Sequence, residues 1–139
     1  MKKMTAIAAI LLASLAAVGT ASAQDHATKA SVPFGFYVGN SWVPAGSYTL
    51  TASSLSPNAI AIRNNKTSVS MINLGHQTEK QAGPNVLVFK KYGDQYFLHE
   101  IRCASGNMNV GFSTSKREKQ AQTNEASLAP ATDIYLAMN

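Results

Sequence analysis

Residues Val86–Cys103 read VLVFKKYGDQYFLHEIRC, and this stretch decides the fold. An apolar run that stops at Lys90 is typical of a central β-strand. Gly93-Asp94 is a turn signal. The residues after it alternate between two faces: Tyr96, Leu98 and Glu100 against Phe97, His99 and Ile101. We therefore predict a β-hairpin with Val86–Tyr92 and Gln95–Cys103 as its strands.

The same period of two, interrupted by turn signals at short intervals, recurs on both sides of this hairpin. It is found in five further stretches: Ser31–Val38, Ser47–Ala52, Ala59–Arg63, Thr67–Leu74 and Ile134–Met138. Alternation of this kind is what a half-buried strand needs. We predict one all-β domain over residues 31–139, with about seven to nine short antiparallel strands. Barrel and sandwich both remain open.

One of these stretches breaks the strict alternation. Val69 and Met71 share one side of Thr67–Leu74, whereas Ile72 and Leu74 lie on the other. A slip of one residue predicts either a β-bulge or a strand that is buried on both faces.

A single helical signal lies near the C-terminus. Ser115-Lys116-Arg117-Glu118 fits the Ser-x-x-Glu capping box, in which the first and last side chains satisfy backbone amides. It predicts a short exposed helix over residues 115–122. A linker over 123–132 then leads to the C-terminal strand, which can complete either its own sheet or that of a neighbour.

The first 23 residues have the three parts of a secretory signal peptide. Lys2 and Lys3 give a positive start, Thr5–Val18 is apolar, and Ala21-Ser22-Ala23 is a small-x-small cleavage site. The apolar run is shorter than the about 20 residues that a membrane-spanning helix needs. We expect cleavage between Ala23 and Gln24 and a flexible start over residues 24–30. The protein is then secreted or periplasmic, with no stable membrane anchor after cleavage.

Charge and cysteine content narrow the class of partner. The chain has 12 Lys+Arg against 7 Asp+Glu, a formal net charge of +5, and two of the positive charges leave with Lys2 and Lys3. So small a surplus of positive charge on a secreted chain argues against nucleic acid as the binding partner. Cys103 is the only cysteine, so no disulfide can form within the chain. A buried thiol is favoured over an intermolecular disulfide.

Two short motifs resemble a family of small secreted bacterial β proteins with an F-x-F-x-V-G start and a P-A-G-x-Y turn. They are VPFGFYVGN at residues 32–40 and VPAGSY at residues 43–48, and Tyr96–Ile101 and Ser115–Glu118 fit the same pattern. The resemblance covers roughly residues 32–118. It implies a secreted β domain and carries over no functional residues.

Catalytic and metal-binding patterns are missing from the sequence. His26, His76 and His99 are far apart, and His99 and Cys103 would lie about 13 Å apart on a strand. We therefore predict no metal site and no cofactor. No Gly-x-Ser-x-Gly elbow occurs, and the carboxylates are scattered along the chain. A secreted hydrolase would need Ser, His and Asp from distant segments, and we favour a non-enzymatic protein.

Aromatic side chains give the remaining hint of function. Six of them can line a groove or a barrel mouth: Tyr37, Trp42, Tyr48, Tyr92, Tyr96 and Tyr135. Trp42, Tyr92 and Tyr96 are the candidate ligand-binding residues, and Trp42 leads because it sits beside a turn. We predict a domain that binds a small molecule, a glycan or a partner protein. The alternative is a subunit of a surface layer or filament that self-associates through its C-terminal strand.

Overall fold

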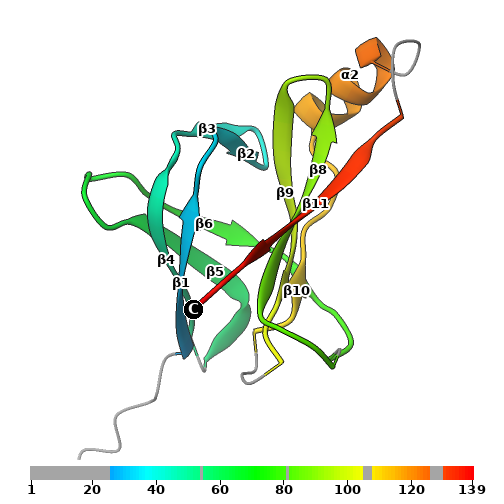
Figure 1. Ribbon diagram of the computed structural model, residues 1–139. Coiled ribbons are helices and arrows are strands. Elements are labelled where there is room, and N and C mark those ends of the chain that lie inside the picture. Colours follow the sequence, from blue (N-terminus) through cyan, green and yellow to red (C-terminus); the bar gives the residue numbers. More distant parts are fainter. Residues whose placement is uncertain (1–25, 54, 81, 105–107, 126–129) are drawn as a thin grey trace, which may run out of the picture.

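The computed structural model describes residues 26–53, 55–80, 82–104, 108–125 and 130–139. These residues form eleven strands and one helix: β1 (His26–Val32), β2 (Phe36–Val38), β3 (Ser41–Val43), β4 (Gly46–Ser53), β5 (Ser56–Asn64), β6 (Ser70–Leu74), β7 (His76–Gln77), β8 (Val86–Tyr92), β9 (Gln95–Arg102), β10 (Val110–Gly111), α2 (Lys116–Glu125) and β11 (Thr132–Ala137). The predicted all-β fold is confirmed (Figure 1). The expected signal peptide, residues 1–23, and the Ala23–Gln24 junction lie outside the described residues.

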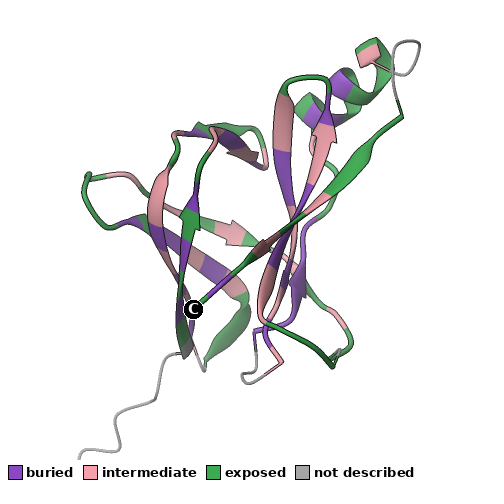
Figure 2. Cartoon of the chain, viewed as in Figure 1, coloured by how far each residue is buried: buried purple, intermediate pink, exposed green. Residues whose placement is uncertain are grey.

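Two sheets enclose the main core. Sheet A has the order β1-β4-β5-β6, and sheet B has the order β11-β8-β9-β10-β7, with β2 beside β9 and β3 beside β2. The inward faces of both sheets are buried (Figure 2), and they bring together Leu50 and Ile62 from sheet A with Phe89 and Ile101 from sheet B. Removal of this apolar surface from water is the main force that holds the sheets together. The arrangement is that of a small barrel or sandwich.

The predicted hairpin is present, with one correction. Strand β8 is central, between β11 and β9, and Gly93 has the positive φ of 58° that the turn requires. The strict alternation in β9 was wrong beyond Leu98, because the register shifts so that Phe89 pairs with Leu98 and Val88 with Glu100. His99 is the extra residue of this bulge, which lets Leu98 and Ile101 both face the core.

The expectation of a flexible start over residues 24–30 was wrong from His26 onward. All seven residues of β1 pair with β4, in a continuous register from His26 beside Ala52 to Val32 beside Gly46. Thr28, Ala30 and Val32 point into the core. Thr28 is polar and Ala30 is small, so the sequence shows no apolar alternation over this stretch. The backbone nevertheless adds a strand to sheet A.

The stretch Ser31–Val38 is two strands rather than one. β1 ends at Val32 in sheet A, and β2 begins at Phe36 in sheet B. Pro33 lacks the backbone donor that a continued ladder would need, so the chain leaves one sheet and enters the other at this point. Breaks of this kind raise the strand number above the predicted seven to nine.

Neither explanation offered for Thr67–Leu74 was right. β6 pairs with β5 in unbroken register from Ser70 to Leu74. The side chains of Ile72 and Leu74 point outward and are 73% and 74% exposed. The slip in the pattern therefore marks aliphatic side chains on the outer face of sheet A.

The C-terminal strand belongs to its own chain. β11 pairs with β8 over all six residues, from Thr132 beside Lys91 to Ala137 beside Val86. Beyond it, the amide of Asn139 donates to the carbonyl of Lys29 at 3.0 Å, and Thr28 Oγ1 donates to the Asn139 carbonyl at 2.7 Å. These bonds tie sheet B to β1 of sheet A. The helix extends to Glu125, three residues into the predicted linker, of which residues 126–129 are not described.

In the described residues, no helix is long and apolar enough to cross a membrane.

Candidate functional site

The helix α2 is fixed to the outer face of sheet B by a buried carboxylate. Ser115 Oγ accepts the amide of Glu118 at 3.1 Å, as the capping box predicts. The Glu118 side chain, only 3% exposed, instead accepts hydrogen bonds from the Tyr92 hydroxyl at 3.1 Å and His99 Nε2 at 2.9 Å. A carboxylate buried this deeply needs such partners, so Glu118 is a docking residue for α2.

The Tyr92 hydroxyl is held in its neutral form. Burial, and next the negative charge of Glu118, raise the pKa of Tyr92 from its ordinary 10.0 to about 12. A neutral phenol donates a hydrogen bond to Glu118, and this bond is what the contact with the helix requires.

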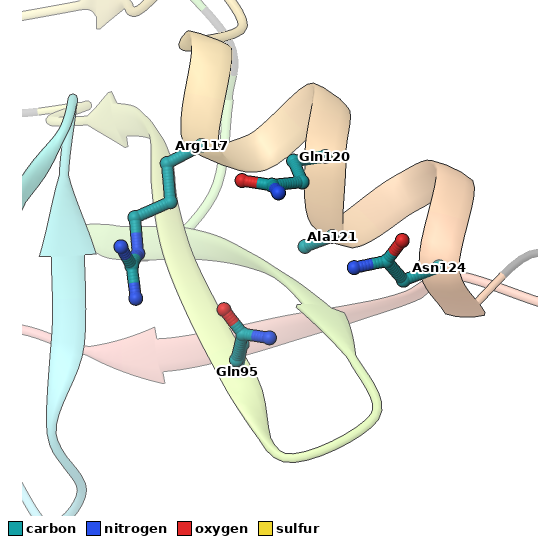
Figure 3. A pocket seen from close by; sticks show the side chains of 5 residues that line it. All are labelled: Gln95, Arg117, Gln120, Ala121 and Asn124. Atoms are coloured by element: carbon teal, nitrogen blue, oxygen red, sulfur yellow. The ribbon is translucent and has the colours of Figure 1, made fainter.

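A polar cleft opens beside this contact, between α2 and the start of β9. Its five lining residues are Gln95, Arg117, Gln120, Ala121 and Asn124, and its volume is about 230 Å³. Figure 3 shows Arg117, Gln120 and Asn124 on the helix and Gln95 on the strand beneath it. The helical residues recur at spacings of three and four, so they share one face of α2.

The Arg117 side chain lies on an aromatic stack. Its guanidinium carbon is 4.6 Å from the centre of the Tyr37 ring, and Tyr37 stacks on Phe97 with centroids 5.0 Å apart. The ion pairs of the described residues do not include Arg117. Cation–π contact holds the guanidinium over the ring, and none of the carboxylates in the described part of the chain takes up its donors.

Trp42 continues the aromatic surface beyond Arg117. It pairs with Tyr37 across the β2–β3 hairpin, so the two rings are on the same face of sheet B. The indole is 59% exposed and lies over Gly35, where an added Cβ would come within 2.8 Å of it. Gly35 therefore permits the ring to lie flat against the backbone. We call Tyr37 and Trp42 the aromatic rim; Tyr37 joins the cleft through its contact with Arg117, and Trp42 joins it through its pairing with Tyr37.

The three aromatic residues predicted to bind a ligand lie in three different places. Trp42 is on the aromatic rim, and Tyr92 is buried under α2. Tyr96 points to the main core and stacks on Phe34 with centroids 3.9 Å apart, with Lys91 Nζ 5.3 Å from its ring. Of the other aromatic residues considered, Tyr48 is in the main core and Tyr135 is exposed near Arg102.

The polar residues of the cleft were missed by the sequence analysis. Gln95, Gln120 and Asn124 are common surface residues, and Arg117 lies in a basic cluster with Lys116 and Lys119 that is more typical of a solvated face than of an anion site. The one available signal was the spacing of residues 117, 120, 121 and 124 on a short helix. The strand β9 beneath the cleft was predicted, but its neighbours were not, because Tyr37 meets Phe97 through a parallel pairing of β2 with β9.

Metal-binding and nucleophilic groups do not gather at the cleft. In the described part of the chain, no group of three or more His, Cys, Asp or Glu side chains could hold a metal ion. Cys103 is buried in the main core, and burial raises the pKa of its thiol. A thiol in this setting is less nucleophilic than an exposed one.

No family model, curated protein or solved structure matches this chain. Its function is therefore inferred from the side chains of the cleft and its aromatic rim.

Proposed function

We propose that this protein is a non-enzymatic carbohydrate-binding domain that holds an acidic saccharide in the cleft between α2 and β9. The observation that carries the proposal is a cleft lined by three carboxamides and one guanidinium. This guanidinium has no ion pair among the described residues and lies on Tyr37, which pairs with the exposed Trp42. We also propose that it works outside the cytoplasmic membrane, as the features of residues 1–23 predict, and that it belongs with the small secreted β proteins that it resembles.

The polar side chains match the chemistry of a sugar acid. Gln95, Gln120 and Asn124 each offer both a donor and an acceptor, which is what a hydroxyl group needs. Arg117 presents a planar set of donors that suits a carboxylate. Carboxamide and guanidinium groups keep the same protonation state near neutral pH, so the cleft favours binding over acid–base catalysis.

The aromatic rim suits the apolar face of a sugar ring. Trp42 on β3 is 59% exposed and pairs with Tyr37 on β2, and aromatic side chains combine an apolar surface with a polar edge. The Tyr37 ring already contacts Phe97 and Arg117, so the Trp42 indole is the part of the rim that a sugar ring would cover. The cleft of about 230 Å³ is smaller than the about 300–1,000 Å³ of pockets for drug-sized ligands. We therefore expect it to hold one sugar unit, while the next unit of the saccharide lies on Trp42.

Calorimetric titration with oligogalacturonides tests this proposal, with neutral cello-oligosaccharides as the comparison. We expect binding of the acidic saccharide only, and a loss of about tenfold or more in affinity for Arg117→Gln, because a charge-assisted hydrogen bond is removed. Lys119→Gln is the matched control, since Lys119 is exposed on the same helix but does not line the cleft. An equal loss in both variants would contradict the assignment.

A further inference from the structure

A second surface, the outer face of sheet A, carries positive charge, and its four strands, as the structure describes them, contain no acidic side chain. Residues 26–78 contain no Asp or Glu, and this segment supplies all four strands of sheet A. Lys29, Arg63 and Lys66 are exposed there. The acidic side chains of the described residues come from the remainder of the chain, in or next to sheet B and α2.

The strand register arranges this face in rows. One row crosses all four strands and consists of Lys29, Thr49, Arg63 and Ser70. The row beside it consists of Ala27, Thr51, Ala61 and Ile72, and Leu74 follows next to Ala59. Positive and hydroxyl side chains therefore occupy one end of the face, and small and aliphatic side chains occupy the other.

A shallow hollow of about 670 Å³ lies over the positive end. It is lined by hydroxyl and amide side chains such as Thr49, Thr51 and Asn65, together with Arg63 and Lys66. Hydroxyl, amide and cationic groups are the donors that bind phosphate oxygens. The hollow thus suits an anionic head group.

The aliphatic end distinguishes between kinds of anionic partner. Ile72 and Leu74 are each about three-quarters exposed on β6, which is unfavourable in water. A soluble polyanion would leave them in water, whereas the boundary between head groups and acyl chains of a bilayer would take them up. Positive charge next to exposed aliphatic side chains favours an anionic lipid surface.

We propose that the outer face of sheet A docks on the surface of a membrane that contains anionic lipids. Lys29, Arg63 and Lys66 lie against the phosphates, and Ile72 and Leu74 enter the head-group boundary. The saccharide cleft lies on the outer face of sheet B, on the other side of the main core. A docked molecule would therefore present its cleft away from the membrane.

Co-sedimentation with vesicles tests the docking surface, using protein purified from the secreted fraction. Vesicles of phosphatidylcholine with phosphatidylglycerol are compared with vesicles of phosphatidylcholine alone. We expect binding to the anionic vesicles only. Each Lys or Arg near an anionic surface contributes about a fivefold factor, so Lys29→Gln/Arg63→Gln/Lys66→Gln should lower vesicle affinity by about 100-fold. Salt at about 1 M should have a similar effect.

Matched variants make the result specific. Lys80→Gln/Lys116→Gln/Lys119→Gln removes the same charge from exposed positions elsewhere and should bind almost as the unaltered protein does, as should Arg117→Gln. Ile72→Ser/Leu74→Ser should weaken vesicle binding but leave retention on immobilised polyphosphate, a polyanion without sugar units, unchanged. Equal binding to both kinds of vesicle, an equal loss in the two triple variants, or no effect of the serine variants would overturn the proposal. Circular dichroism verifies that each variant is folded.

Discussion

At the scale of single residues, the cleft depends on side chains that contribute little to the fold. Trp42 is the only tryptophan of the chain and is 59% exposed, so its removal leaves no cavity in the core. Tyr92 contributes more to the fold, because it is buried and its hydroxyl connects sheet B to Glu118 of α2. The two residues, both predicted to bind a ligand, should therefore respond differently to substitution.

Trp42→Ala should weaken saccharide binding and leave stability almost unchanged. We expect affinity for the oligogalacturonide to fall by about tenfold, since an aromatic contact contributes about 1 kcal/mol or more. The free energy of unfolding should change by less than about 0.5 kcal/mol, as for most exposed positions. Calorimetry and urea unfolding measure the two quantities. A large loss of stability would show that the indole is needed for packing.

Tyr92 should make stability depend on pH in the alkaline range. Its pKa is raised from 10.0 to about 12 in the folded protein, so folding favours the neutral phenol. The neutral phenol therefore adds at most about 2–3 kcal/mol to the free energy of unfolding. This stabilisation is complete below pH 10 and is lost as the pH rises through about 12. Urea unfolding at successive pH values should show a steeper decline for the unaltered protein than for Tyr92→Phe. Parallel declines would contradict this role of Tyr92.

At the scale of elements, the helix α2 is positioned by one carboxylate and a small apolar contact. Glu118 bonds to Tyr92 and His99, and Ala121 packs on Tyr92 and Phe97. The helix was predictable because Ser115 and Glu118 lie three residues apart, as the capping box requires. Its partner surface was not, because it depends on the bulge at His99 and on the pairing of β2 with β9. The predicted β8–β9 hairpin likewise depends on residues that are close in sequence. Strand β1 was missed because it forms only by pairing with β4, which lies further along the chain.

Glu118→Ala should release α2 from sheet B. The loss of two charge-assisted hydrogen bonds should lower the free energy of unfolding by about 3 kcal/mol. Hydrogen exchange should then be faster over residues 116–125 than over the β8–β9 hairpin. Glu118→Gln keeps an acceptor for the Tyr92 hydroxyl and should have a smaller effect. Unchanged protection of the helix in the Ala variant would show that α2 does not depend on this carboxylate.

At the scale of the whole molecule, the two sheets are connected at the C-terminus. The amide of Met138 donates to the Asn85 carbonyl at 2.9 Å, and Asn139 bonds to Lys29 and Thr28 of β1. The side chain of Met138 is buried in the main core. The alternation of Ile134–Met138 predicted the strand, but which sheet edge it would join was beyond the sequence.

Deletion of Met138 and Asn139 should loosen the junction between the sheets. We expect a loss of about 3 kcal/mol, from one buried side chain and three hydrogen bonds. Hydrogen exchange should increase mainly in β1 and β11. Saccharide affinity should be preserved, because the cleft is formed by α2 and β9 and the aromatic rim by β2 and β3. A change in affinity without a change in stability would contradict this separation.

The central claim is that an acidic saccharide binds in the cleft between α2 and β9, against the aromatic rim. Because Trp42 is the only tryptophan, titration of its fluorescence with an oligogalacturonide reports directly on that rim. We predict a saturable shift of the emission to shorter wavelength, which is lost in Arg117→Gln and kept in Lys119→Gln. Tight binding of the saccharide with no change in Trp42 emission, or with the same affinity in Arg117→Gln, would contradict the claim.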